Sequence, residues 1–338
     1  MSNITLSIDD ATALATKAFI SASVDQNTAF QVARVLVQSE IDGQVGHGLI
    51  RVGSYIVQIK SGKINTKAIP SLKEVTPVVS IADADHGFSY PAITLSLDFL
   101  KKSANKYGIA ISTIRHSHHF GQAGLHVEQL AEAGLIGWCC GNTPSAMAIY
   151  GGIKPFFGTN PIACAFPMPE NKSPLVIDMA LSVVARGKIV KAKKEGTKIS
   201  PDWAVDKQGK PTTDPEEALR GSLLAIGGAK GSALALMVEL YSACLTNSKL
   251  SVEADSLLEP GGTFPDLGHT FIAINPMIIS EGNGYLDRVK DLLREYAIAA
   301  PQGRLPGISR LTFREKAKQQ GLSISNILYE ELNELAKK

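Results

Sequence analysis

A single histidine stands between two glycines in the segment GQVGHGLIR, residues 43–51. Glycine allows backbone conformations closed to other residues and lets a ligand come close, so His47 could act in a binding loop. Arg51 follows four residues later, where a helical turn would place its guanidinium near the imidazole and where it could hold a carboxylate through two hydrogen bonds. The pair suits reduction of a 2-oxo or 2-imino acid, although spacing alone also fits a structural turn histidine.

Three more histidines occur in RHSHHFGQAG, at positions 116, 118 and 119. They end a strand-like pattern, and the glycines that follow open a helical one, so backbone N–H groups at the helix start could meet a phosphate. We therefore predict contact with a cofactor, with a structural histidine pair as the alternative. A metal site is disfavoured because the histidines lie on a turn with no acidic ligand nearby.

Polar side chains interrupt two apolar runs further along the chain. In FFGTNPIACAFP, Thr159 and Asn160 offer a hydroxyl and an amide in an apolar setting, as a small polar substrate requires, or they form an ordinary turn. In PLVIDMALSVVARGKI, Asp178 follows four apolar strand residues. It could orient a catalytic histidine or cap the helix that we expect next.

Two glycine-containing segments carry positive charge. IGGAKGSALALMVEL places Lys230 at the opening of an apolar helix, and GRLPGISR places Arg304 and Arg310 around a Pro-Gly turn. Backbone N–H groups and cations are what a pyrophosphate or a 2′-phosphate needs, although each segment alone could be a plain loop. The expected G-x-G-x-x-G fingerprint of a Rossmann fold is absent, and so is a P-loop.

The elements that must position these residues follow a helical, then α/β, then helical layout. Apolar residues recur at helical spacing from Ser7 to Ile41, and a third helix is predicted over Ile50–Lys60. From about residue 75, short β-branched runs alternate with helical patterns, which indicates an α/β domain. Charged amphipathic helices return from Leu286 onward, so the two chain ends could pack together.

Bulk composition favours a small-molecule partner. Of 338 residues, 44% are apolar and 20% charged, and the net charge of +2 gives little field for attracting nucleic acid or a membrane. The four cysteines lack metal-binding spacing and are interpreted as buried, reduced thiols. No signal peptide or membrane anchor is visible, so we expect a cytoplasmic protein.

Taken in order, the segments GHGLIR, SHHFGQAG, FFGTNPIA, VIDMALSVVARGKI, GGAKGSALALMVE and GRLPG resemble the malate/L-lactate dehydrogenase-type family of NAD(P)H-dependent oxidoreductases. Within it, the chain is most similar to the Δ1-piperideine-2-carboxylate/Δ1-pyrroline-2-carboxylate reductases. The resemblance implies an α/β fold with a non-Rossmann, largely antiparallel central sheet. It also implies a homodimer, a discontinuous helical domain over residues 1–75 and 285–338, and a dinucleotide-binding domain over residues 76–284.

The resemblance also implies roles for individual residues. His47 would be the proton donor, Asp178 its charge-relay partner, Arg51 the group that holds the substrate carboxylate, and Thr159 a neighbour of the substrate. The implied dinucleotide contacts are His119, Phe120, Gly121, Gln122, Ala123, Asp178, Ala180, Ser182, Lys230, Arg304, Pro306, Gly307 and Arg310. No metal is implied.

The functional hypothesis is NADPH-dependent reduction of a small cyclic imino acid, with NADH as the alternative cofactor. The rivals are reduction of a 2-oxo acid on the same fold and a dinucleotide-binding protein that has lost activity. Two positions depart from the family pattern: Gly46 replaces the usual serine before the histidine, and Ala229 stands where relatives often carry histidine or tyrosine.

Overall fold

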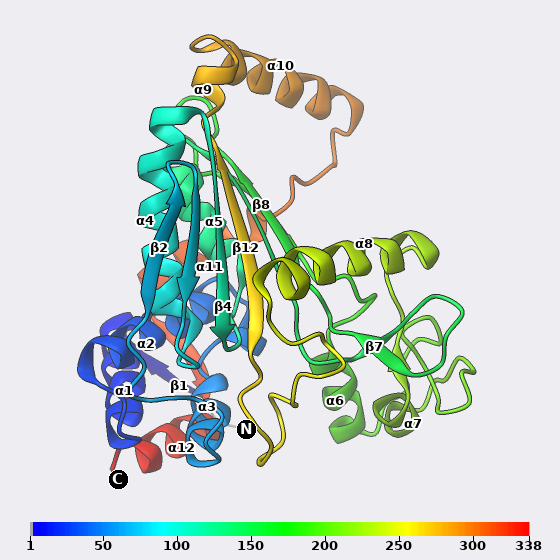
Figure 1. The fold of residues 1–338 in the computed structure, drawn as a ribbon. Coiled ribbons are helices and arrows are strands. Elements are labelled where there is room, and N and C mark those ends of the chain that lie inside the picture. Colours follow the sequence, from blue (N-terminus) through cyan, green and yellow to red (C-terminus); the bar gives the residue numbers. More distant parts are fainter. Residues whose placement is uncertain (1–2, 338) are drawn as a thin grey trace.

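A seven-stranded sheet forms the centre of the computed structural model, which describes residues 3–337 (Figure 1). The strand order is β2-β3-β4-β12-β5-β8-β9, and every neighbouring pair is antiparallel except β3 and β4. The strands are β2 Ser71–Thr76, β3 Val79–Asp83, β4 Ile109–Ser117, β5 Ile136–Gly141, β8 Ile162–Phe166, β9 Leu175–Met179 and β12 Leu267–Ile274. The prediction of a non-Rossmann, largely antiparallel sheet is confirmed.

Helices cover the two faces of this sheet. Successive side chains along a strand point to opposite faces of the sheet, so neighbouring residues of β5 contact helices on both faces. A Cβ at Gly137 would meet Leu130 of α5 (Ala123–Glu132), whereas Trp138 packs edge-on against Tyr241 of η2 (Leu240–Cys244) at 5.5 Å. Beside α5 on the first face lies α4 (Ser89–Tyr107), and η2 continues α8 (Ala229–Glu239). Because both faces are covered, the middle strand β12 is mostly buried, and its second half is apolar throughout.

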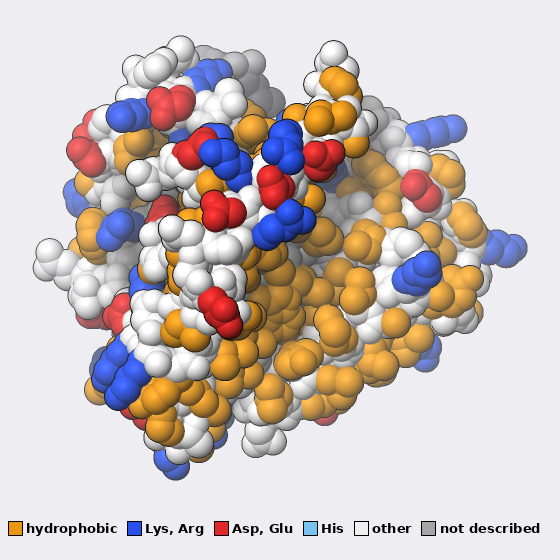
Figure 2. Space-filling model, turned by 90° about the horizontal axis from the view of Figure 1, so that it is seen from above, with side chains coloured by type: hydrophobic (Ala, Val, Ile, Leu, Met, Phe, Trp, Pro, Cys, Tyr) orange, Lys and Arg blue, Asp and Glu red, His pale blue; other side chains and the backbone are white. Residues whose placement is uncertain are grey.

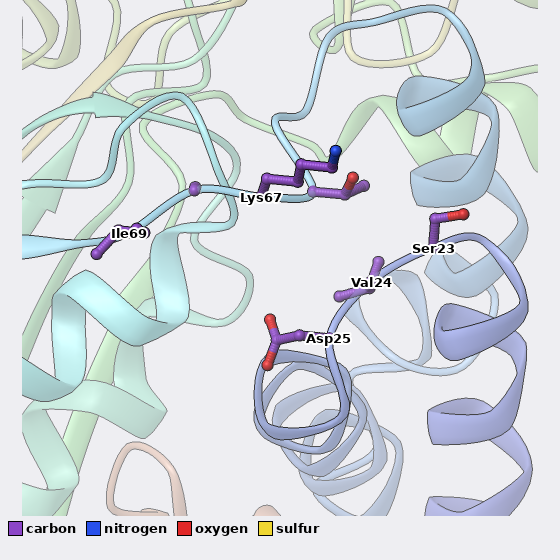
Figure 3. A pocket seen from close by; sticks show the side chains of 7 residues that line it. Ser23, Val24, Asp25, Lys67 and Ile69 are labelled. Carbon is purple, nitrogen blue, oxygen red and sulfur yellow. The ribbon is translucent and has the colours of Figure 1, made fainter.

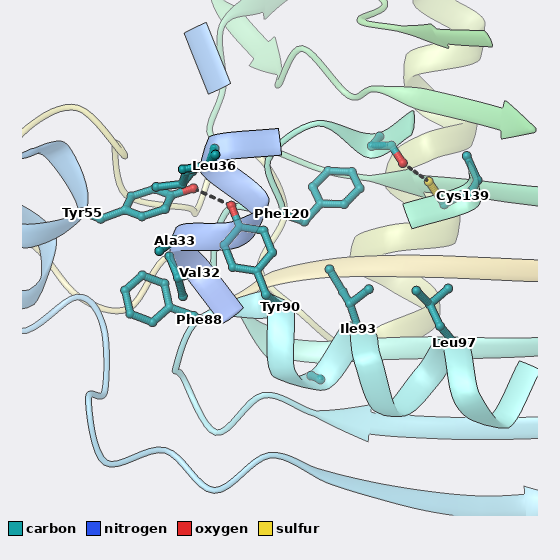
Figure 4. Close-up of a cluster of buried hydrophobic side chains, with 14 of the residues drawn as sticks. Val32, Ala33, Leu36, Tyr55, Phe88, Tyr90, Ile93, Leu97, Phe120 and Cys139 are labelled. Carbon is teal, nitrogen blue, oxygen red and sulfur yellow. Dashed lines mark hydrogen bonds between the residues drawn. The ribbon is translucent and has the colours of Figure 1, made fainter. Parts of the chain in front are cut away.

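The main core joins the N-terminal helices to the sheet. Helix α2 (Gln26–Ile41) buries Val32 and Leu36, one turn apart, so its apolar stripe faces inward. Figure 4 shows these side chains close to Ile93 of α4 and to Phe120, which follows β4. The core therefore extends to the segment that contains the predicted cofactor contacts.

Both chain ends meet at one side of the molecule. Strand β1 (Asn3–Leu6) pairs antiparallel with β13 (Leu322–Ser325). Helix α10 (Gly284–Ala299), by contrast, lies at the far end of the sheet beside α9 (Pro276–Ile279) (Figure 1). The residue boundaries of the two domains stay a prediction.

The remaining elements complete the architecture. A four-stranded sheet has the order β10-β11-β6-β7. Its strands are β6 Met147–Ala148, β7 Pro155–Phe157, β10 Ala204–Val205 and β11 Ser222–Leu223. The other helices are α1 Ile8–Ser21, η1 Val45–His47, α3 Arg51–Lys60, α6 Arg186–Glu195, α7 Pro215–Arg220, α11 Ile308–Gln320 and α12 Asn326–Ala336. The helix predicted over 50–60 is confirmed as α3.

Two expectations from composition can be compared with the fold. All four cysteines are free, but Cys164 is only half-buried and Cys244 is exposed, so the prediction that every thiol is buried holds only for Cys139 and Cys140. Cys244 is the last residue of η2. Within residues 3–337, no helix is both long and apolar enough to cross a membrane.

A buried ion-pair network links three helices. Arg314 of α11 donates to both carboxylate oxygens of Asp42, at 2.7 and 2.9 Å, and to those of Glu128 on α5, at 2.8 and 2.6 Å. Asp42 follows the last residue of α2, and its side chain is 0% exposed. Although burial alone would lower it, the two carboxylates raise the pKa of Arg314 above its ordinary value. The network therefore ties the end of α2 to the sheet domain just before the loop that contains His47.

Replacing Arg314 should be costly. The variant Arg314→Leu leaves the buried Asp42 without a cation and Glu128 with Arg310 alone, so we expect the free energy of unfolding in urea to fall by about 3 kcal/mol. Arg288→Leu is the matched control, because Arg288 is paired with Asp291 but its side chain is 82% exposed. That change should cost less than about 1 kcal/mol. Equal effects of the two substitutions would contradict a structural role for the network.

Candidate active site

The loop that contains His47 is held by a buried carboxylate. Oε2 of Glu40 accepts a hydrogen bond from the Leu49 backbone N–H at 3.0 Å, and burial raises the pKa of Glu40. A Cβ at Gly48 would collide with this carboxylate. Glycine therefore leaves room for a close approach between loop and helix here, and the loop is less free than its composition suggests.

His47 and Arg51 lie together as predicted. Arg51 begins α3, and its Nε donates to the Gly46 carbonyl at 2.7 Å. No other hydrogen bond of this guanidinium occurs within the described residues, so its terminal nitrogens can hold a carboxylate. Burial, and then the positive charge of Arg51, lower the pKa of His47 to about 4. The His47 imidazole is therefore neutral at neutral pH.

The segment 119–123 lies against His47. The rings of His47 and His119 stack with centroids 5.5 Å apart and an interplanar angle of 12°. Gly121 has φ +69°, and a Cβ there would lie 2.9 Å from the hydroxyl oxygen of Tyr90. Nε2 of Gln122 donates to Asp42 at 3.3 Å. The turn that begins α5 is thus fixed by the tyrosine and by the ion-pair network.

Asp178 lies inside β9, and α6 begins only at Arg186, so the interpretation of Asp178 as a helix cap for the following helix is wrong. Its Oδ2 instead accepts a hydrogen bond from Gly124 N–H, at 2.8 Å, in the first turn of α5. Asp178 is exposed, yet desolvation by nearby protein atoms outweighs that hydrogen bond and raises its pKa to about 6. Within the described residues, no hydrogen bond joins Asp178 to His47.

The turn at residues 304–307 packs against the same strand. Gly307 has φ +73°, and a Cβ there would collide with the Val176 carbonyl of β9. The side chain of Arg304 is exposed and has no partner among residues 3–337. Arg304 is thus an unpaired cation, within the described residues, on the turn that packs against β9.

Arg310 faces inward. Its guanidinium donates to Glu128 and to the Pro174 carbonyl, both at 2.8 Å, and the residue is only 6% exposed. The expectation of a charge open to a cofactor phosphate is therefore corrected: this cation is neutralised by a buried carboxylate. Its contribution is to hold the 304–307 turn in place.

Backbone hydrogen bonds bring the remaining predicted segments together. Leu181 N–H donates to the Thr159 carbonyl at 2.8 Å, and Ile226 N–H donates to the Leu181 carbonyl at 2.9 Å. Ser182, which forms a bridge with Ala225, is buried, and its hydroxyl donates to the Val184 carbonyl. The Thr159 turn, the strand exit after Asp178 and the approach to α8 are consequently neighbours.

Two side chains in this region have opposite roles. Lys230, in the first turn of α8, is exposed and has no partner within the described residues. Asn160 is fully buried, and its amide donates to the Ala235 carbonyl at 3.2 Å and to Glu239 at 3.0 Å. The suggestion that the Asn160 amide serves a substrate is therefore wrong, because that amide anchors α8.

Ring contacts and hydrogen bonds link many of the predicted residues or their neighbours, and we call this set of residues the strip. It begins at Arg51 and His47, continues through the stacked His119, and reaches Asp178 through Gly124. The rest of the strip is Phe120, Gly121, Gln122 and Ala123 at the start of α5, Ala180 and Ser182 after β9, Thr159, Lys230, and the Arg304, Pro306 and Gly307 turn. Within this set, Phe120, Ala123 and Ser182 are only 1%, 2% and 4% exposed, so their side chains are packed inside the protein.

Sequence analysis missed several residues that shape the strip. Tyr55 and Tyr90 are buried, and the Tyr55 hydroxyl lies 2.7 Å from Nδ1 of His119. Tyr55 is four residues after Arg51 on α3, so helical spacing could have placed it on the same face. No local signal pointed to Glu40 or Asp42, because their partners lie elsewhere along the chain.

Other candidate sites are less suitable. A pocket of about 450 Å³ is lined by Ser23–Asp25 and Thr66–Ile69, and Figure 3 shows that Asp25 and Lys67 are among its side chains. None of the predicted site residues lines it. Across residues 3–337, no group of three His, Cys, Asp or Glu side chains could hold a metal ion.

Known proteins are similar to this chain in sequence and in fold. The profile of the malate/L-lactate dehydrogenase family matches residues 6–333. The (2R)-3-sulfolactate dehydrogenase (NADP(+)) of Chromohalobacter salexigens is 41% identical over 332 residues, covering 98% of each chain. The Δ1-pyrroline-2-carboxylate reductase of Ancylobacter novellus is 36% identical over 334 residues, covering 98% of this chain and 97% of its own.

A solved structure agrees over the whole architecture. The Δ1-piperideine-2-carboxylate reductase of Pseudomonas syringae pv. tomato superposes with a TM-score of 0.92 at 34% identity, covering 98% of this chain and 99% of that one. The resemblance inferred from six short motifs is therefore confirmed. The chain belongs to the malate/L-lactate dehydrogenase family of oxidoreductases.

Proposed function

We propose that this protein reduces the C2 carbon of a small cyclic imino acid, converting Δ1-pyrroline-2-carboxylate to L-proline and Δ1-piperideine-2-carboxylate to L-pipecolate with NADPH. The observation that carries the proposal is a neutral His47 beside one cation, Arg51, whose terminal nitrogens are free. A single cation matches a substrate with a single carboxylate. Two of the named relatives are reductases of this substrate class.

The chain's own residues would orient the substrate and manage the proton. A reduced nicotinamide supplies the hydride to C2, and the imine nitrogen gains one proton. Arg51 would hold the carboxylate in two hydrogen bonds, and His47 would supply or relay the proton. Asp178, ionised at neutral pH, would stabilise positive charge on the imidazole or on the iminium. Most of the rate enhancement would come from positioning.

The strip suits a dinucleotide with a 2′-phosphate. The segment 119–123 leads into the N-terminus of α5, where a helix favours a phosphate, and Lys230 and Arg304 are exposed cations without partners in the described residues. Two free cations favour NADPH, and the relative from Chromohalobacter is named as NADP(+)-dependent. NADH stays the alternative, and the ratio of the two KM values tests the choice.

The decisive experiment follows NADPH absorbance with Δ1-pyrroline-2-carboxylate, Δ1-piperideine-2-carboxylate, pyruvate, oxaloacetate and 3-sulfopyruvate. We expect the two imines to have the highest kcat/KM.

The variant His47→Ala tests the role of this histidine. Its kcat should be at least about 100-fold lower than that of the wild type, because general acid–base catalysis contributes that much. NADPH binding by this variant, measured by fluorescence, should be nearly unchanged. If this variant turns over substrate as fast as the wild type does, His47 is not the proton donor.

The second candidate is reduction of a 2-oxo acid, and the observation that favours it is the 41% identity to a sulfolactate dehydrogenase. The substrate would then carry a sulfonate as well as a carboxylate. Such a dianion would be held best by a second cation near Arg51. A higher kcat/KM for 3-sulfopyruvate than for either imine would favour this candidate.

A third candidate, a cofactor-binding protein without activity, is motivated by Gly46 alone. It predicts NADPH binding without turnover of any substrate in the panel. A Cβ at Gly46 would have nothing within 4 Å, and its φ is not positive, so Gly46→Ser introduces the missing hydroxyl without strain. If the wild type has no measurable turnover and the Gly46→Ser variant does, the third candidate is supported.

We expect the titration of Asp178 to produce a step in the pH dependence of kcat/KM. Its pKa of about 6 makes the carboxyl neutral below pH 6 and negative above it. We expect kcat/KM to fall as the pH drops through about 6, because protonation removes the charge that stabilises a positive imidazole or iminium. In Asp178→Asn, which can still accept from Gly124, kcat/KM should be low and this step absent. A step that persists in the variant would assign it to another group.

We also propose that the protein is a homodimer whose interface includes α8 and η2. Leu236, Leu240 and Leu245 are 49%, 54% and 53% exposed along this segment. A helix that is apolar all round is normally buried. Figure 2 shows a broad hydrophobic surface on the face seen from above, on the side where Figure 1 places α8. A second copy of the chain would cover it.

The dimer proposal predicts a change in molecular mass. By light scattering, the wild type should have the mass of two chains and Leu240→Glu that of one, because a charge in an apolar interface is strongly unfavourable. Ile69→Glu is the control, since Ile69 is 81% exposed at a different surface and should leave the mass unchanged. A monomeric wild type would refute the proposal.

Finally, we propose a cytoplasmic location. The four cysteines are all free, although Cys139 and Cys140 are adjacent, which is typical of proteins in a reducing compartment. Cell fractionation with an antibody against the native protein would test this location.

A further inference from the structure

A pair of buried tyrosines lies directly behind the stacked histidines. The Tyr55 hydroxyl is 3.0 Å from the Tyr90 hydroxyl and 2.7 Å from Nδ1 of His119. Tyr55 and Tyr90 are 3% and 2% exposed, and Figure 4 shows their hydroxyls pointing toward one another within the apolar core. The contacts form a row of three polar atoms that ends at the ring beside His47.

Only one placement of the protons gives every donor in this row an acceptor. If Nδ1 of His119 carried the proton, it would donate to Tyr55, and Tyr55 would donate to Tyr90. The Tyr90 proton would then have no acceptor, because Tyr55 is the hydrogen-bond partner of that hydroxyl within the described residues. In the reverse direction, Tyr90 donates to Tyr55 and Tyr55 donates to Nδ1, so every proton has an acceptor. Buried polar groups favour the fully bonded arrangement.

The reverse direction determines where the His119 proton lies. With Nδ1 accepting, a neutral imidazole carries its hydrogen on Nε2. Burial and the nearby charge of Arg51 lower the pKa of His119 far below its ordinary value, so the ring is neutral. Nε2 has no hydrogen-bond partner among residues 3–337, yet it is not among the buried polar atoms without partners, whereas both ring nitrogens of His118 are. Nε2 of His119 therefore reaches the open side of the site.

We propose that Tyr55, backed by Tyr90, is a positioning residue that holds His119 in the Nε2–H tautomer, so that a second neutral N–H faces the site beside His47. The role in turnover rests on the proposed function, whereas the tautomer itself does not. A fixed Nε2–H is a donor for a carbonyl or carboxylate oxygen of a bound ligand. The other tautomer would present a lone pair to the same oxygen and repel it.

The direct test is nitrogen NMR on the protein without ligand, with ¹⁵N-labelled histidine. The two nitrogens of a neutral ring have very different shifts, so the spectrum reports which one carries the proton. Signals of His119 are assigned as those lost in His119→Gln. We expect wild-type His119 to be protonated on Nε2 and Tyr55→Phe to shift toward a mixture of tautomers. A wild-type ring protonated on Nδ1 would overturn the proposal.

Kinetics test the consequence for turnover. Tyr55→Phe keeps the ring in the core and removes the donor, so kcat should fall about tenfold while the Kd for NADPH changes little. Tyr90→Phe should have a smaller effect, because Tyr55 can still donate to His119. Tyr107→Phe is the control, since Tyr107 is 47% exposed and its hydroxyl has no hydrogen bond within the described chain.

A double substitution separates positioning from general loss of structure. In His119→Gln, the amide can present an N–H near the place of Nε2 without help from Tyr55. If Tyr55 acts through the His119 tautomer, adding Tyr55→Phe to this background should lower kcat by less than twofold. A full tenfold further loss would show that Tyr55 acts independently and would refute the kinetic part. If no tested substrate turns over, the proposed function fails, and the NMR result still decides the tautomer.

Discussion

Two buried carboxylates share one arginine, and the rest of the site depends on this arrangement. Asp42 ends α2, Glu128 lies on α5, and Arg314 of α11 binds both. In a poorly solvated place, each charge is tolerable only while its partner stays within hydrogen-bond distance. The helices therefore cannot separate independently. The loop that follows Asp42 and the turn that begins α5 are consequently kept next to each other, and His47 meets His119 there.

Burial also sets the charge state of the site. Desolvation lowers the pKa values of His47 and His119, so both imidazoles are neutral, and it raises the pKa of Asp178 toward neutrality. Arg51 stays positive, and it lowers the pKa of the two histidines further. The site thus combines neutral N–H donors with one cation and one carboxylate that titrates near pH 6. Such an arrangement is suited to orienting a small anion and moving a proton locally.

Glycines at several positions allow two segments of the chain to pack in close contact. A side chain at Gly48 would collide with Glu40, one at Gly124 would press on Asp178, and one at Gly307 would collide with the Val176 carbonyl. In the sequence these residues look like flexible turns. In the structure each lies at a contact between two segments, because only a hydrogen in place of Cβ leaves room for a carboxylate or a carbonyl oxygen.

The sequence by itself determined the local features. Helical periodicity predicted α2 and α3, β-branched runs predicted the strands, and six short motifs were sufficient to recognise the family and with it the antiparallel sheet. Only the tertiary structure decided which polar groups are available. Asn160 and Arg310 look like ligand-binding residues, yet their buried partners occupy them, while Tyr55 becomes part of the site through His119. The reason is physical: periodicity is set by neighbours along the chain, whereas the hydrogen-bond partner of a buried group comes from wherever folding brings another segment.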